Sequence, residues 1–140
     1  MQAIIGRQFP GKVIPLIDNA KTSIDIIVFD WRWYPQDPSA PVQLFNQAIV
    51  RAVRRGVKVR AVANNDQIIS VLNSVGVEAK RFRDSNIVHA KMMIIDNEKV
   101  ITGSHNYTQN AFQMNLEVST IIEKVEDITE FLQYFKNIYG

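Results

Sequence analysis

The sequence predicts an α/β fold in which helices sandwich a mixed β-sheet, as one domain over residues 1–140. Two observations lead to this prediction. Strand-like and helix-like segments alternate through the first half of the chain, and several closely spaced strand segments follow. No internal repeat, linker or low-complexity tract divides the chain, and 140 residues, of which 46% are hydrophobic, can bury one core.

The first half of the chain contains two helical and two strand patterns. Apolar residues at helical spacing predict a helix over residues 11–21, and the apolar run S-I-D-I-I-V-F predicts a buried strand over Ser23–Phe29. Helical spacing resumes at Val42 and stops at Gly56. The alternating run V-K-V-R-A-V-A predicts a second strand over Val57–Ala63.

The second half of the chain is richer in strands. A short helix is expected over Asp66–Val75, closed by Gly76, and a final amphipathic helix carries apolar residues from Ile128 to Ile138. The predicted strands are Val77–Phe82, His89–Ile95, Lys99–Thr102 and Asn115–Ile122.

Composition narrows the possible chemistry. The absence of cysteine excludes disulfides, thiolate metal sites and a cysteine nucleophile. The net charge of +2 permits a polyanionic partner without requiring one. No apolar run approaches the roughly 20 residues of a membrane span, and the N-terminal residues lack a signal-peptide pattern, so a cytoplasmic location is expected. Carboxylates and histidines do not cluster, so no metal or other cofactor is expected.

One segment, V-H-A-K-M-M-I-I-D over Val88–Asp96, holds one of only two histidines. Side chains two residues apart on a strand point to the same face, so His89 and Lys91 are presented together. Burying both without partners would be costly, which favours a polar cavity at the end of the strand. By itself the pair is also compatible with a core histidine and a lysine that reaches the surface.

The longer pattern is more specific. It reads H-x-K-x4-D-x6-G-S-x-N and comprises His89, Lys91, Asp96, Gly103, Ser104 and Asn106. At ~5% usage for each residue type, six specified positions arise by chance in roughly one such chain in a million. The spacing resembles the signature of the phospholipase D superfamily, the H-K-D phosphodiesterases. Downstream, Asn115–Glu117 is similar to the acidic segment of the small single-motif bacterial endonucleases in that superfamily.

These residue types suit a phosphodiester, which is an anion. Lys91 supplies a positive charge, Ser104 and Asn106 supply donors for nonbridging oxygens, and Gly103 lets the backbone come close. A neutral imidazole nitrogen of His89 can attack phosphorus and form a phosphohistidine. Glu117 can hold the other ring nitrogen and stabilise the resulting cation. Histidine and lysine then provide nucleophile, acid and charge, so no metal is required.

The leaving group needs a proton, which calls for a second, protonated histidine. The resemblance implies that two motifs build one site, but this chain has a single motif. The other histidine, His105, lies in the G-S-x-N turn, where the family position is variable. A second copy of His89 is therefore expected from a partner subunit, and a homodimer is predicted.

Asp96 completes the motif, yet it lies an odd number of residues from His89 and would face away from it on a strand. A catalytic role and a turn-anchoring role therefore both stay open. Asp30, at the end of the first strand, is a candidate for the mouth of the cleft.

Three further groups of side chains have alternative interpretations. The aromatic residues of the proline-broken loop Trp31–Pro41 could stack on bases, insert at a membrane interface, or cover the sheet edge or a dimer contact. A first basic run, Arg51 to Arg60, is more typical of a solvated helix end than of a phosphate track. A second, Lys80 to Arg83, could line an anion-binding groove.

The sequence therefore predicts a metal-independent phosphodiesterase. The principal hypothesis is a nuclease that cleaves DNA or RNA through a covalent phosphohistidine at His89, in a site shared across a homodimer. One alternative is a lipid phosphodiesterase of the phospholipase D or phosphatidyltransferase type, acting at a membrane surface. The other is a weakly active nucleic-acid-binding module of a larger protein.

Overall fold

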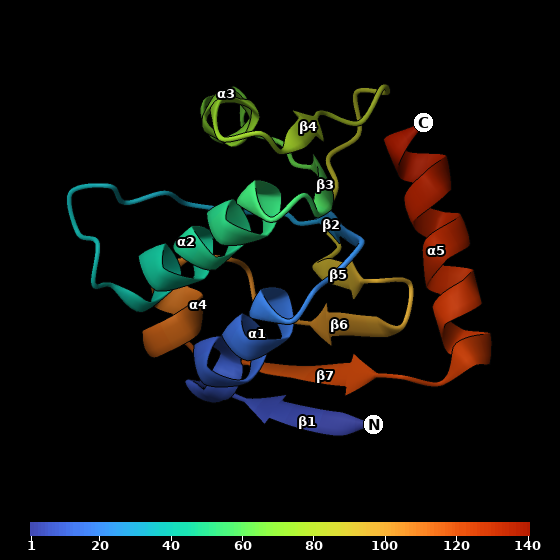
Figure 1. Ribbon diagram of the computed structural model, residues 1–140, viewed down its shortest axis with the longest axis horizontal. Coiled ribbons are helices and arrows are strands. Elements are labelled where there is room, and N and C mark those ends of the chain that lie inside the picture. The colour runs from blue at the N-terminus through green and yellow to red at the C-terminus, as the bar shows by residue number, and fades with distance from the viewer.

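Seven strands form one mixed sheet: β1 (Gln2–Ile5), β2 (Ser23–Ile27), β3 (Lys58–Val62), β4 (Glu78–Lys80), β5 (Met92–Ile95), β6 (Lys99–Gly103) and β7 (Val118–Ile122). The computed structural model describes residues 1–140, and the strand order is β1-β7-β6-β5-β2-β3-β4. Strands β2, β3 and β4 are parallel, whereas each of the other neighbouring pairs is antiparallel (Figure 1).

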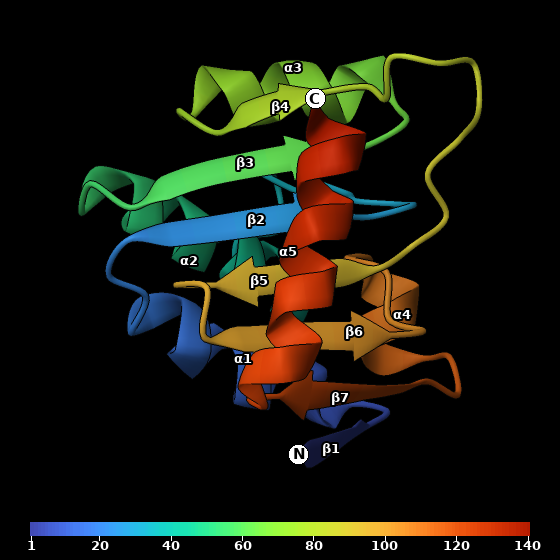
Figure 2. The ribbon, with the colours of Figure 1, turned by 90° about the vertical axis from the view of Figure 1, so that its right-hand side faces the viewer.

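Five helices cover the sheet: α1 (Gln8–Asp18), α2 (Pro41–Arg54), α3 (Asp66–Ser74), α4 (Gln109–Gln113) and α5 (Val125–Tyr139). Helices α1, α2 and α4 lie over one face, and α5 crosses the other face alone (Figure 2). Alternation along β5 matches these two layers, because Met93 and Ile95 join the larger core while Met92 and Ile94 join the core under α5. No helix has both the length and the apolar character needed to cross a bilayer.

The structure confirms the predicted sandwich of helices around a mixed sheet, with differences at the element ends. Strand β5 begins only at Met92, so the strand predicted over His89–Ile95 is wrong over its first three residues. Pairing with both neighbours stops at Met92, which leaves His89 and Lys91 in a segment that leads into the strand. The sequence also gave no signal for α4 or for β1, because α4 is short and only Ile4 of β1 is buried.

The strand directions bring several loops to one end of the sheet. Ile27 at the end of β2 is opposite Met92 at the start of β5, and Gly103 at the end of β6 is opposite Ser119 near the start of β7. The segments that follow β2, β3 and β6 and those that precede β5 and β7 therefore gather at this end, on the right in Figure 2. Almost all of the motif lies here.

Candidate active site

His89 and Lys91 form the centre of this end of the sheet. The Lys91 Nζ lies 3.3 Å from Nδ1 of His89. The Phe29 ring packs against both, with its centroid 4.7 Å from that of the imidazole and 5.5 Å from the ammonium. His89 is exposed and Lys91 is half-buried. A ring nitrogen accessible to substrate and a fixed positive charge are thus held side by side.

The G-S-x-N turn is held against β7. A Cβ on Gly103 would lie 2.4 Å from the Cα of Ser119 and 2.5 Å from the carbonyl oxygen of Val118, so this backbone approach needs glycine. The Ser104 hydroxyl donates to Glu117 Oε1 at 2.5 Å and accepts from the backbone N–H of Val118 at 3.0 Å. Ser104 is therefore engaged within the protein, and its first role is to fix the turn.

Asn106 has a donor to spare. Its Oδ1 accepts the backbone N–H of Asp30 at 3.1 Å, and its Nδ2 makes no hydrogen bond within the protein. This contact also orients the amide by fixing which end is the oxygen. The arrangement leaves an N–H group free to donate to an anionic oxygen.

Glu117 is not positioned as expected within one chain. Its Oε1 accepts from Ser104 and its Oε2 accepts from Asn115 Nδ2 at 3.0 Å, and no hydrogen bond joins it to His89. The expected contact between Glu117 and the His89 ring is therefore not made within this subunit, where the Glu117 carboxylate instead holds Ser104 and Asn115.

Asp96 lies at the opposite end of β5 from His89, so the catalytic role considered for it is wrong. Its carboxylate accepts the backbone N–H groups of Lys21, Thr22 and Ser23 at 2.7–3.1 Å, and the Thr22 hydroxyl at 3.0 Å. Burial alone would raise the pKa of Asp96, but these hydrogen bonds outweigh it and lower the pKa. Asp96 anchors the β5–β6 turn to the start of β2.

His105 is a structural residue. It is 1% exposed, and its ring packs at a tilt against that of Phe9, with 4.6 Å between the centroids. Its Nε2 lies 2.8 Å from the Gly6 carbonyl oxygen, which can only accept, so Nε2 carries the proton and Nδ1 accepts from Ser119 at 2.7 Å. Burial lowers the pKa of His105, with partial opposition from the Gly6 hydrogen bond and the charge of Glu117. A neutral imidazole with both nitrogens engaged cannot protonate a leaving group.

Asn64, which the sequence pattern did not single out, immediately follows the segment predicted as a strand over Val57–Ala63. Its Nδ2 donates to the carbonyl oxygens of Phe29 at 3.0 Å and Val88 at 2.8 Å, and its Oδ1 accepts the Val88 N–H at 2.9 Å. The side chain therefore ties the residue before His89 to the ends of β2 and β3. Its position after a predicted strand was the only available signal.

Two side chains in the surrounding segments, Trp31 and Arg51, decide between the earlier alternatives for their own positions. Trp31 is 2% exposed and donates to Asn46 at 2.7 Å, so it covers the core rather than a membrane interface. In the first basic run, Arg51 pairs with Asp18 at 3.0 Å, which agrees with a solvated helix end.

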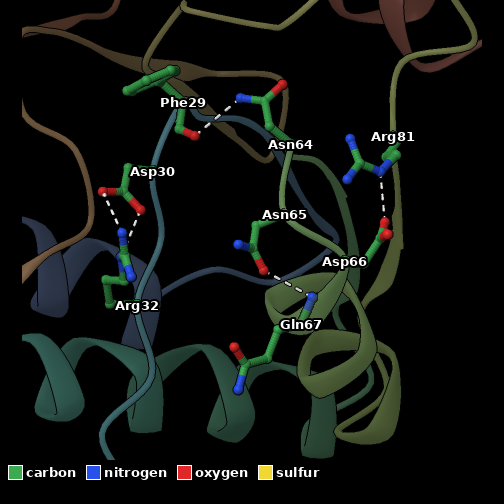
Figure 3. Close-up of a pocket in the computed structure, with 8 residues that line it drawn as sticks. All are labelled: Phe29, Asp30, Arg32, Asn64, Asn65, Asp66, Gln67 and Arg81. Carbon is green, nitrogen blue, oxygen red and sulfur yellow. Dashed lines mark hydrogen bonds and ion pairs between the residues drawn. The ribbon is translucent and has the colours of Figure 1, made fainter. Parts of the chain in front are cut away.

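A cavity of about 510 Å³ opens next to Phe29 (Figure 3). Asp30 lines it, as predicted for the cleft mouth, and so does Arg81 of the second basic run. No group of three or more His, Asp or Glu side chains is placed to hold a metal ion. The eight residues that line the cavity are Phe29, Asp30, Arg32, Asn64, Asn65, Asp66, Gln67 and Arg81.

Comparison with known proteins agrees with the resemblance inferred from the motif. The family model described as cardiolipin synthase, PLD-like domain, matches residues 13–139. The chain is 32% identical over 126 residues to mitochondrial cardiolipin hydrolase of Mus musculus, covering 86% of this chain and 53% of that protein. It is 32% identical over 127 residues to phospholipase D of Rickettsia conorii, covering 86% and 59%. The chain thus spans little more than half the length of these curated relatives.

Solved structures match over nearly the whole chain. Nuc from Salmonella typhimurium, a phospholipase D family member, superposes with a TM-score of 0.81 at 25% identity, covering 98% of this chain and 93% of that one. NucT from Helicobacter pylori has a TM-score of 0.77 at 23% identity, covering 97% and 92%, and supports the fold.

Proposed function

Because this chain belongs to the family of PLD-like domains, within the phospholipase D superfamily, we propose that it is a phosphodiesterase and that its substrate is a nucleic acid. The observation that carries the proposal is the exposed His89 imidazole 3.3 Å from the Lys91 ammonium, at the same end of the sheet as the free Nδ2 donor of Asn106. The structural match to Nuc, a phospholipase D family member, supports this assignment.

The proposed reaction has two displacement steps at phosphorus. A ring nitrogen of His89 attacks, the P–O bond to the leaving group breaks, and a phosphohistidine forms. Lys91 and the Asn106 Nδ2 stabilise the negative charge on the nonbridging oxygens. Water then attacks the phosphohistidine and releases His89. No metal is needed to supply nucleophile, acid or charge.

The leaving oxygen must receive a proton, and His105 cannot supply it. We propose that His89 of the partner subunit is the general acid, so that a homodimer contains the complete site. The same histidine can then accept the proton of the attacking water. A monomeric mass in light scattering, together with full activity, would contradict this shared site.

A lipid substrate is the second candidate, favoured by the names of the curated relatives, cardiolipin hydrolase and phospholipase D. The same residues could act on any phosphodiester. A binding module with little turnover is less well supported, because His89, Lys91 and Asn106 are all present in a usable arrangement.

The test is cleavage in excess EDTA of single- and double-stranded DNA and RNA, and of cardiolipin vesicles, by the wild type and His89→Asn. We expect nucleic-acid cleavage by the wild type only, with a phosphohistidine that is trapped by quenching in alkaline denaturant, where the P–N bond is stable. If only the cardiolipin vesicles were cleaved, the substrate would be a lipid rather than a nucleic acid. Activity lost in EDTA and restored by Mg²⁺ would refute the metal-independent mechanism.

A further inference from the structure

We propose that the groove between the loop after β2 and the start of α3 is a nucleoside-binding subsite, which holds the base and sugar adjacent to the scissile phosphate. This inference rests on the proposed function and assigns the part of the substrate that the motif does not contact. If the inference is right, the groove selects the class of substrate, and the motif acts only on the phosphate.

Two adjoining cavities form the groove. The first cavity has a volume of about 510 Å³ and is lined mostly by polar residues. It begins at Phe29, whose ring packs on the His89 imidazole. The second, about 360 Å³, is lined by the aromatic residues Trp33 and Tyr34. The four residues common to both cavities are Asp30, Arg32, Asn65 and Gln67. The two cavities therefore connect Phe29, the neighbour of His89, with the aromatic side chains of Trp33 and Tyr34.

The charges along the groove are balanced. Arg32 pairs with Asp30 at 2.8 Å, and Arg81 pairs with Asp66 at 2.6 Å, on opposite walls (Figure 3). Each wall thus carries one cation paired with one anion, and this arrangement does not favour a run of phosphates, which would require a net positive track. The groove is instead suited to a largely neutral group that follows the reacting phosphate.

The uncharged groups in the groove match a nucleoside. Gln67 is exposed, and its side-chain amide makes no hydrogen bond within the protein. The Asn65 Oδ1 caps α3, which leaves its Nδ2 free to donate. Amide side chains pair with base edges, and aromatic rings stack on base faces. A glycerophosphate headgroup offers neither a flat face nor a patterned edge, so these groups favour a nucleoside over a lipid.

Two diesters with the same leaving group test the subsite: methyl p-nitrophenyl phosphate and thymidine 5′-(p-nitrophenyl phosphate). Gln67→Ala and Trp33→Leu should lower kcat/KM for the thymidine diester by roughly fivefold to a hundredfold, the loss expected for one stacked base. Neither should change kcat/KM for the methyl diester by more than about twofold, and that rate also reports whether the variants are folded. The matched control is Gln133→Ala, an exposed glutamine on α5.

Equal effects on both diesters, or no effect on either, would overturn the subsite. A wild type that hydrolyses the two diesters equally well would also overturn it. Failure of the proposed function has a different signature, because neither diester would then be hydrolysed in a His89-dependent manner.

Discussion

Replacement of Asn64 by alanine should slow catalysis without abolishing substrate binding. The substitution removes three hydrogen bonds, two to the backbone of Val88 and one to that of Phe29. At about 1 kcal/mol for each bond, up to about 3 kcal/mol of local ordering is lost. If that ordering is recovered only in the transition state, kcat falls by roughly a hundredfold, because 1.36 kcal/mol corresponds to tenfold in rate.

The assay is the steady-state hydrolysis of methyl p-nitrophenyl phosphate, with kcat and KM determined separately and urea unfolding measured in parallel. The chain offers a matched control in Asn73, whose amide also bonds both backbone groups of one residue, Ala79, at 2.9 and 3.1 Å. Asn73→Ala should reduce stability by a similar amount for each lost bond while leaving kcat unchanged. If Asn64→Ala is destabilised but retains kcat within about twofold of the wild type, Asn64 does not position His89.

Two further predictions concern the framework of the site. Gly103→Ala should lower the free energy of unfolding, measured in urea, by at least about 3 kcal/mol, because the new Cβ would lie 2.4–2.5 Å from backbone atoms of β7. A urea midpoint equal to that of the wild type would show that β7 can shift to make room for the Cβ. Asp96→Asn should cost about 2 kcal/mol near pH 7, since a neutral amide cannot replace the hydrogen-bonded carboxylate. The folded-state pKa of Asp96 lies below its usual value of 3.8, so its stabilisation is present above that pH and is lost as the pH falls through the folded pKa. The stability difference between wild type and Asp96→Asn should therefore shrink below about pH 4, and a difference that stays constant down to pH 2 would contradict the assigned role.

The sequence by itself determined the general architecture, the superfamily and the residue types of the candidate site. Strand and helix periodicity arise from local side-chain alternation, so the mixed sheet with helices on both faces was predictable. The spacing of His89, Lys91, Gly103 and Asn106 was sufficient to identify the superfamily. The prediction that Asn106 offers a donor also followed from residue type alone.

Only the tertiary structure decided which members of the motif meet. Asp96 and His89 are close in sequence, but they lie at opposite ends of β5 because that strand runs across the sheet between them. Asn64 and Val88 are 24 residues apart, yet they are joined because β3 ends where the segment before β5 begins. Periodicity along a chain fixes the face on which a side chain lies. The strand order and directions fix which loops share an end of the sheet, and the site is assembled from those loops.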